Sequence, residues 1–294
     1  MTDAAGQRAE GGGDRVAEST SGRLSQLGPT PWLVLGGGGV KGMAHVGAWR
    51  RLRETGTRVE GVIGCSIGAL VGACICAGMD AWDMVRIARV LERKDIIRIN
   101  RRAAWVNGLK AESVFRGDTL RDYISRILPA RDWDDLVLPL QVNAVDLATG
   151  EVHWFGPGAR TDVTLHDAIY ASSALPVFYP PAEMAASWFV DGGVDQSLPL
   201  NRGPAVGASG LLAVDCGSGP AADPSRVVAQ GMVAVHHRVM SIMIRKRRTE
   251  LQRSWNKLPT ALVRPDLDGY DTFDFDAIPH FLDAGYAATK ERLG

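Results

Sequence analysis

A serine stands between two glycines at residues 64–68, which read GCSIG. A G-x-S-x-G segment can carry the nucleophile of an acyl-transfer enzyme when it forms a sharp turn between a strand and a helix. The segment before it, VEGVIG, is typical of a buried strand, and the segment after it is rich in small and apolar residues. This context favours Ser66 as a nucleophile, with Gly64 and Gly68 leaving room around it, over a purely structural turn.

A second turn, residues 36–42, reads GGGGVKG and also follows an apolar strand. Gly37, Gly39 and Gly42 satisfy the G-x-G-x-x-G fingerprint of dinucleotide sites, but the second strand lacks the acidic residue that would hold a ribose at its end. Free N–H groups in such a turn can stabilise a phosphate or the oxyanion of an acyl transfer. Taken alone, the turn supports a phosphate cradle, an oxyanion hole and a structural turn equally.

A nucleophilic serine needs a neighbour that accepts its proton. Asp191 ends an apolar segment, SWFVD, and is followed by Gly192 and Gly193, which allow another part of the chain to approach its carboxylate. A carboxylate that takes the serine proton directly would form a two-residue catalytic unit. Taken alone, an Asp-Gly pair more often caps a turn.

A histidine base is the alternative. In a Ser-His-Asp triad of the α/β-hydrolase kind, the histidine comes late in the chain. His236 and His237 fall inside a helical pattern, so His280 is the histidine that could complete such a triad.

Composition limits the classes of function. The 294 residues contain 33 Lys and Arg against 33 Asp and Glu, which gives a formal net charge of zero and removes the general electrostatic case for a nucleic-acid binder. The four cysteines lack zinc-ligand spacing and suggest no disulfide scaffold, so we expect reduced thiols, no metal and no cofactor. No secretory signal is visible, and we expect a cytoplasmic protein without an obligate protein partner.

Hydrophobic patterns place the motifs on an α/β framework. We expect strands at 32–36, 59–64, within 138–156 as a pair, at 187–193 and at 210–217. We expect helices at 41–55, 67–78, from Asp80 onward, around 118–128, and at 164–173, 226–256 and 276–292. The alternation predicts a parallel sheet with crossover helices. Residues 1–30 are expected to be a flexible tail, and residues 31–294 a single domain.

In this order and spacing, the three motifs resemble those of the patatin-like phospholipases. The motifs are GGGVKG at 37–42, GCSIG at 64–68 and DGG at 191–193. The neighbouring segments MAHVG, VNAVDLATGEVHWF and ASSALPVFYPP support the resemblance, which covers about residues 31–220. The bacterial patatin-like proteins and the catalytic domain of neuropathy target esterase are the most similar. Gly193 departs from the alanine that many members have there.

The resemblance implies a three-layer α/β/α fold with a mostly parallel central sheet and a nucleophile elbow after the second strand. It also implies a Ser–Asp dyad without histidine, in which Ser66 is the nucleophile and Asp191 the proton acceptor. The backbone of Gly37, Gly38 and Gly39 would form the oxyanion hole. The implied substrate is a lipid acyl ester, of the phospholipase A, lysophospholipase or lipid esterase type.

Two further residues match the family pattern around the first turn. Lys41 occupies the family's basic position, and we interpret it as structural or electrostatic rather than catalytic. His45 is expected to be packed and hydrogen-bonded. Two rival functions stay open: an α/β-hydrolase esterase that uses Ser66, an aspartate and His280, and a non-catalytic nucleotide-binding module at 36–42.

Two other segments carry expectations about substrate and membrane. Residues 93–116 mix arginines with aliphatic residues, and part of this segment is expected to border the acyl cleft. The alternative, that the segment is an ordinary surface connection, stays equally open. Residues 226–256 predict a helix packed on the core, because apolar residues recur at helical spacing, with a solvated basic end, RKRR, at 245–248. The sharper hypothesis is that this basic end makes a peripheral contact with anionic lipid at the inner membrane surface.

Overall fold

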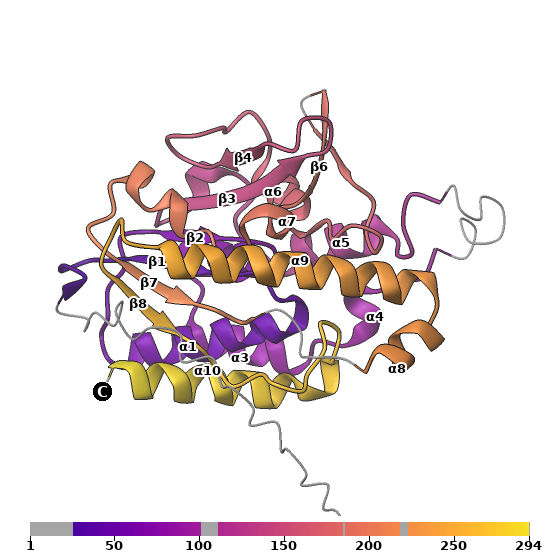
Figure 1. The fold of residues 1–294 in the computed structure, drawn as a ribbon. Coiled ribbons are helices and arrows are strands. Elements are labelled where there is room, and N and C mark those ends of the chain that lie inside the picture. The colour runs from indigo at the N-terminus through magenta and orange to yellow at the C-terminus, as the bar shows by residue number, and fades with distance from the viewer. Residues whose placement is uncertain (1–25, 101–110, 185, 218–222, 294) are drawn as a thin grey trace, which may run out of the picture.

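The central feature of the computed structural model is a mixed sheet of eight strands. Figure 1 shows this sheet among the helices that surround it. The structure describes residues 26–100, 111–184, 186–217 and 223–293. The strands are β1 (Trp32–Leu35), β2 (Val62–Gly64), β3 (Leu140–Asp146), β4 (Val152–Phe155), β5 (Ala182–Met184), β6 (Ser187–Asp191), β7 (Leu211–Val214) and β8 (Thr260–Val263).

Strand order brings segments that are distant in the sequence together at one end of the sheet, where its parallel strands finish. The order is β5-β6-β3-β2-β1-β7-β8, with β4 paired to β3. Strands β3, β2, β1, β7 and β8 run parallel, whereas β4 and β6 each pair antiparallel with β3. Because β1 and β2 are parallel neighbours, the turns that follow them lie side by side at the carboxyl ends of these strands.

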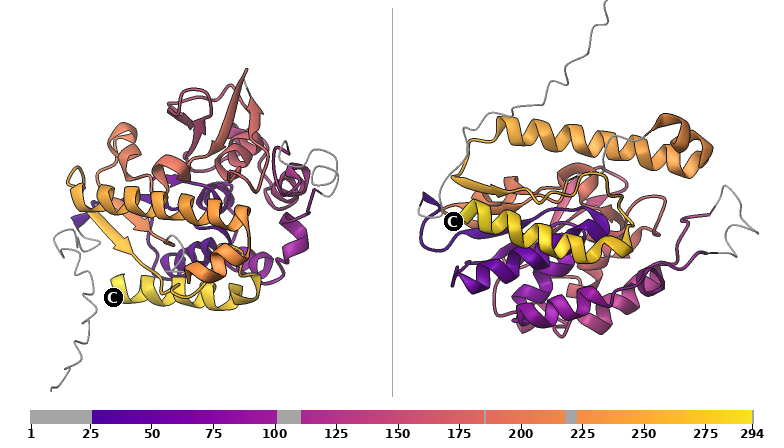
Figure 2. Two further views of the ribbon diagram at one scale, coloured as in Figure 1. Left: turned by 45° about the vertical axis from the view of Figure 1, so that its right-hand side comes forward. Right: turned by 90° about the horizontal axis from the view of Figure 1, so that it is seen from below.

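Helices surround the sheet, and those expected from the sequence appear in the expected order, whereas the short helices at Arg93–Ile96 and Gly193–Gln196 were not expected. The helices are α1 (Met43–Glu54), α2 (Ile67–Cys76), α3 (Ala81–Arg89), α4 (Arg93–Ile96), α5 (Gly117–Ile127), α6 (Leu165–Ser173), α7 (Gly193–Gln196), α8 (Pro224–Ala229), α9 (Met232–Ser254) and α10 (Ile278–Leu293). Asp80 caps α3, as predicted, because its carboxylate accepts from the N–H groups of Trp82 and Asp83. In Figure 2, α9 forms an outer layer on one side, and α1 and α10 lie on the other.

The two faces of the sheet are buried in two separate hydrophobic clusters. Alternate side chains of β1 show this, since side chains along a strand point to opposite faces. Leu33 and Leu35 belong to the larger cluster with α1, α2 and α10. Trp32 and Val34 belong to a smaller cluster with residues of the 198–208 segment and with Trp255, which follows α9.

The tail and the long C-terminal helix differ from the expectations. Residues 1–25 of the expected tail lie outside the described residues, but Leu27 is fully buried and its carbonyl accepts a hydrogen bond from Ser209. The packed part of the chain therefore begins before residue 31. The helical pattern of 226–256 is split into α8 and α9, with Gly231 between them at a φ of 89°.

The prediction that the 226–256 helix packs on the core is wrong. No residue of α9 is buried, and Val228, Met232, Val235 and Val239 are exposed. The physical reason lies in the smaller cluster: residues of the 198–208 segment already cover that face of the sheet, and α9 contributes only Leu251.

Helices α1 and α10 approach each other closely enough to bring their backbones into contact. A Cβ atom on Gly47 would lie 1.9 Å from the carbonyl oxygen of Leu282, and one on Gly285 would lie 1.9 Å from that of Ala44. Glycine at both positions therefore lets the two helices pack. Because α1 begins directly after the glycine-rich turn, this crossing helps to hold that turn in place.

We expect Gly285→Ala to destabilise the protein, although alanine is the better helix former by about 1 kcal/mol. The added methyl group would have to push α10 away from α1, and overpacking of this kind costs about 1–3 kcal/mol. Urea denaturation of the full chain measures the change. As a control on the same helix, Asp283→Ala at an exposed position should shift the midpoint little, and an unchanged midpoint in Gly285→Ala would contradict the close crossing.

Candidate active site

Ser66 lies in a strained turn between β2 and α2. Its φ of 55° and ψ of −125° are in a region that residues other than glycine rarely adopt. The turn is tight because a Cβ atom on Gly68 would lie 2.2 Å from the carbonyl oxygen of Leu35. The N–H of Ser66 donates to the hydroxyl of Ser172 on α6 at 2.9 Å, which helps to hold this conformation.

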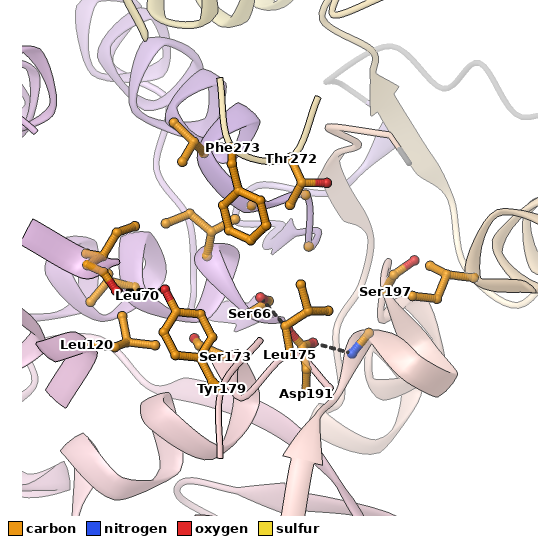
Figure 3. A pocket seen from close by; sticks show the side chains of 18 of the residues that line it. Ser66, Leu70, Leu120, Ser173, Leu175, Tyr179, Asp191, Ser197, Thr272 and Phe273 are labelled. Carbon is orange, nitrogen blue, oxygen red and sulfur yellow. Dashed lines mark hydrogen bonds between the residues drawn. The ribbon is translucent and has the colours of Figure 1, made fainter. Parts of the chain in front are cut away.

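Asp191 meets Ser66 from the end of β6. The antiparallel register pairs Asp191 with Ala144 on β3, while the parallel register pairs Gly64 with Val142, so the two side chains reach the same level of the sheet. Ser66 Oγ donates to Asp191 Oδ2 at 2.7 Å, as Figure 3 shows. The N–H of Gly193 donates to the other carboxylate oxygen, Oδ1, at 2.7 Å.

The environment of Asp191 shifts its acidity. The residue is 4% exposed, and burial raises the pKa of its carboxyl to about 6. Hydrogen bonds from Ser66 and Gly193 act in the opposite direction, because they favour the ionised form. A carboxylate that is ionised near neutral pH, yet has a raised pKa, is a better proton acceptor than an exposed one.

Two buried polar residues support this pair and were not singled out from the sequence. Asn143 on β3 donates to the carbonyls of Gly192 and Gln196, at 3.3 and 3.2 Å, and so holds the backbone that follows Asp191. Ser172 is the acceptor for the Ser66 N–H. Both lie in segments, VNAVD and ASS, whose only signal in the sequence was similarity to a family.

The glycine-rich turn faces the same pocket as Ser66, and its N–H groups are not equivalent. Gly37, Gly38 and Gly39 all line the pocket. The N–H of Gly37 donates to the carbonyl of Ser197 at 2.7 Å. Within the described ranges, the N–H groups of Gly38 and Gly39 donate to no protein acceptor. Of these three glycines, only Gly37 has its N–H engaged by another described residue.

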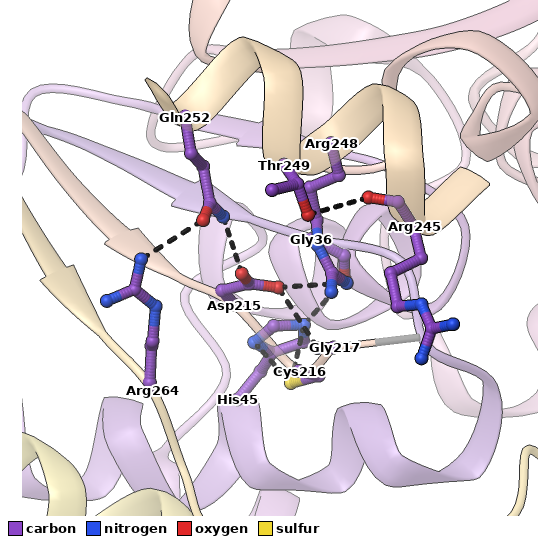
Figure 4. Close-up of polar contacts among 10 residues, drawn as sticks. All are labelled: Gly36, His45, Asp215, Cys216, Gly217, Arg245, Arg248, Thr249, Gln252 and Arg264. Carbon is purple, nitrogen blue, oxygen red and sulfur yellow. Dashed lines mark hydrogen bonds and ion pairs between the residues drawn. The ribbon is translucent and has the colours of Figure 1, made fainter. Parts of the chain in front are cut away.

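Buried side chains behind the turn hold it from the other side. His45 is fully buried, its Nε2 lies 2.7 Å from the carbonyl oxygen of Gly36, and burial lowers its pKa to about 4. The imidazole is therefore neutral, and Nε2 donates to Gly36, which confirms the expected packed histidine. Cys216 contacts the same ring at 3.4 Å (Figure 4). Lys41 is also buried, and burial lowers the pKa of its ammonium group.

The remaining motif glycines lie at the ends of helices and strands, beside the turns that their motifs form. Gly42 immediately precedes α1, Gly64 ends β2, and Gly192 and Gly193 directly follow Asp191.

The pocket beside Ser66 has a volume of about 140 Å³. Apolar side chains form most of its wall, among them Leu70, Leu91, Ile96, Leu120, Tyr123 and Tyr179. Figure 3 shows Leu70, Leu120 and Tyr179 together on one side of Ser66, with Ser197 on the other. Ile96 confirms that part of residues 93–116 borders this cleft; residues 101–110 lie outside the described residues.

The structure does not bring His280 to Ser66. His280 Nε2 lies 3.1 Å from the carbonyl oxygen of Asp266, its ring packs against Tyr270, and it does not line the pocket. His237 on α9 does line the pocket, where its ring contacts Phe178 and Phe273 and burial lowers its pKa. Nothing in the sequence pattern predicts His237 at this pocket, because its helix was expected on the core.

No group of three or more His, Cys, Asp or Glu side chains in the described chain could hold a metal ion. None of the described helices is long and apolar enough to cross a membrane. The four cysteines are buried and unpaired, as the composition predicts.

Known proteins show which family shares these features. A family model described as Patatin-like phospholipase matches residues 33–202. The Uncharacterized NTE family protein Mb1092c of Mycobacterium bovis is 32% identical over 213 residues, which cover 72% of this chain and 54% of that protein. Patatin-like phospholipase domain-containing protein 7 of Rattus norvegicus is 26% identical over 277 residues, which cover 86% of this chain and 20% of that protein. The chain thus spans about half of the first relative and a fifth of the second.

A solved structure shows a similar arrangement of the chain. VipD from Legionella pneumophila superposes with a TM-score of 0.53 at 15% sequence identity, covering 90% of this chain and 67% of VipD. The matched family region contains the glycine-rich turn, Ser66 and Asp191 and extends over more than half of the chain. The chain belongs to the patatin-like phospholipase family, and its mostly parallel sheet with surrounding helices is the fold of that family.

Proposed function

We propose that the chain hydrolyses acyl esters of lipids, with Ser66 as nucleophile and Asp191 as proton acceptor. The 2.7 Å hydrogen bond from Ser66 Oγ to Asp191 Oδ2, in the wall of an apolar pocket, is the observation that carries this proposal. Membership of the patatin-like phospholipase family supports it.

The reaction follows from this geometry in two halves. Ser66 Oγ attacks the acyl carbonyl carbon while Asp191 Oδ2 takes the hydroxyl proton, which leaves a negative charge on the carbonyl oxygen. The ester bond then breaks, the leaving alcohol takes the proton from Asp191, and an acyl-enzyme remains. Water attacks this ester with Asp191 again accepting a proton, and the return of that proton to Ser66 releases the fatty acid.

The negative charge on the carbonyl oxygen needs donors in the pocket. The N–H groups of Gly38 and Gly39 are the candidates, because both residues line the pocket and these N–H groups have no protein acceptor among the described residues. The N–H of Gly37 is engaged by Ser197, so its role is to shape the turn. This narrows the oxyanion hole expected from the sequence to two of its three glycines.

The pocket lining favours an acyl chain over a phosphate. Among the described residues that line it, Asp191 and His237 are the titratable groups of carboxyl or imidazole type, and none is a lysine or an arginine. A nucleotide at 36–42 would place phosphates beside the carboxylate of Asp191 without a cation to offset their charge. We therefore prefer a lipid ester as substrate, hydrolysed by an activity of the phospholipase A, lysophospholipase or lipid esterase type.

The cytoplasmic location and the lack of an obligate protein partner stay predictions.

We expect Ser66→Ala and Asp191→Asn to lower kcat/KM toward p-nitrophenyl acyl esters by about three to four orders of magnitude each. Both substitutions remove one member of a unit that moves a single proton, so the double variant should be no worse than either single one. Labelling by a fluorophosphonate probe, followed by peptide mapping, should find the label on Ser66 in the unmodified chain.

His237→Ala and His280→Ala serve as controls for the base. Each should keep substantial activity, because neither side chain accepts a hydrogen bond from Ser66. A folded His280→Ala protein without turnover, beside an active Asp191→Asn protein, would refute the dyad and favour the triad.

The raised pKa of Asp191 makes stability depend on pH. The folded chain binds a proton more tightly than the unfolded chain between about pH 4 and pH 6, so this group contributes stability that is lost as pH rises through that window. Above pH 6, the raised pKa of Asp191 lowers the free energy of unfolding by about 3 kcal/mol relative to its value in acid. Asp191→Asn should therefore unfold at higher temperature than the unmodified chain at pH 8, with a smaller difference at pH 4.5. Equal differences at both pH values in thermal unfolding would contradict the buried carboxylate.

Leu91 and Tyr123 should set the length of the acyl chain. Both line the Ser66 pocket and also a surface hollow bordered by Ile87, Val90 and Ile127, so they form the wall between the two. Leu91→Ala would open this wall, and each methylene buried beyond it is worth about 0.8 kcal/mol.

The ratio of long-chain to medium-chain hydrolysis should then rise by about an order of magnitude across a series of p-nitrophenyl esters. Ile127→Ala, which truncates a side chain of the hollow alone, is the matched control and should keep the original profile. An unchanged profile in a folded Leu91→Ala protein would disprove the wall.

A further inference from the structure

Exposed apolar side chains gather on one segment of this protein. Of the twelve large apolar residues with the greatest exposure in the described chain, six lie between residues 228 and 243. They are Val228, Met232, Val233, Val235, Val239 and Met243. Large apolar clusters on a surface commonly mark a site of association.

The spacing of these residues defines one face of α9. Met232, Val235, Val239 and Met243 are separated by three or four positions and lie on one side of the helix, which we call the outer face. His237, Met240, Ser241 and Ile244 lie on another side and line the Ser66 pocket. The helix therefore covers the pocket with one side and exposes apolar side chains on another, in the outer layer seen in Figure 2.

The second half of α9 is fastened to the fold by polar contacts. Arg248 pairs with the buried carboxylate of Asp215 at 3.3 Å, and Gln252 donates to the same carboxylate at 2.6 Å (Figure 4). Arg247 pairs with Asp195. Two of the four residues in the basic end at 245–248 are thus engaged within the protein, which weakens the hypothesis that this end is the lipid contact.

The charge of the whole segment is nevertheless one-sided. Residues 224–249 contain no aspartate or glutamate and six cations, in a chain whose net charge is zero. The cations are Arg226, Arg238, Arg245, Lys246, Arg247 and Arg248. An exposed apolar stripe flanked by cations is the pattern of a helix that lies in the interface of an anionic membrane.

A surface groove connects this segment with the candidate active site. The groove runs between α8, the start of α9 and residues 269–274, and it shares His237, Ser241, Thr272 and Phe273 with the Ser66 pocket. A lipid leaving a surface beside α8 and α9 would therefore enter the pocket from the adjoining groove.

We propose that Val228 and the outer face of α9 dock the chain on an anionic lipid surface. Apolar side chains enter the headgroup region, and the cations of residues 224–249 attract the negative lipids. The surface would supply the substrate of the proposed reaction, on which the biological meaning of docking rests. Docking itself needs no turnover and can be measured without it.

Flotation with vesicles tests this surface on the full chain. The unmodified chain should bind vesicles of phosphatidylglycerol and phosphatidylcholine at least ten times more tightly than vesicles of phosphatidylcholine alone. The triple variant Val235→Gln, Val239→Gln, Met243→Gln should lose at least tenfold in binding. Arg226→Gln with Lys246→Gln should weaken binding and reduce its dependence on salt.

Matched variants separate docking from other effects. Val90→Gln with Val137→Gln changes apolar residues elsewhere that are even more exposed, and this variant should bind as the unmodified chain does. Ser66→Ala should also bind normally, and the triple variant should hydrolyse a water-soluble ester at the unmodified rate. If the chain binds vesicles but hydrolyses no ester, the docking proposal holds and the proposed function is overturned. If the chain hydrolyses esters but binds no vesicles, the proposed function holds and the docking proposal is overturned.

Three results would overturn the docking proposal. The first is equal binding by the triple variant and the unmodified chain. The second is equal binding to neutral and anionic vesicles. The third is self-association, measured by light scattering, that the triple variant abolishes while no vesicle binding occurs; the outer face would then be an interface between copies of this chain.

Discussion

The rest of this structure depends on bringing a buried carboxylate to the hydroxyl of a serine in a strained turn. An isolated buried carboxylate is costly, and here Asp191 accepts hydrogen bonds from Ser66 and Gly193 that offset part of the cost. Asn143 holds the backbone beyond Asp191, and Ser172 holds the backbone of Ser66. Each partner therefore stabilises an arrangement that neither segment would adopt alone.

The glycine-rich turn is held in the same way, by parts of the chain far from it in sequence. Ser197 engages the N–H of Gly37, and His45 donates to the carbonyl of Gly36 from behind. The close crossing of α1 and α10 holds the helix that follows the turn. Among the described residues, the N–H groups of Gly38 and Gly39 stay without a protein acceptor, as the proposed oxyanion hole requires.

Helix α9 connects this site with the outside of the molecule. Its second half is fixed through Asp215, whereas its first half has pocket-lining residues on one side and exposed apolar residues on another. The same helix can therefore cover the proposed acyl site and face a lipid surface. A core-packed helix, as the apolar spacing alone suggested, could do only the first.

The sequence by itself determined most of the elements, though not β5, α4 or α7, and it determined the motifs around Ser66, because strand and helix periods and turn chemistry are local properties. The choice of Asp191 as the base rested on the resemblance of the three motifs, taken together, to a family. Tertiary structure decided which residue Ser66 contacts, since Asp191 and His280 are both distant in the chain and strand register brings only Asp191 to it. It also decided which glycine N–H groups stay available and which way the apolar stripe of α9 points. Periodicity shows that a helix has an apolar face, but only the packing of the other elements decides whether that face is covered.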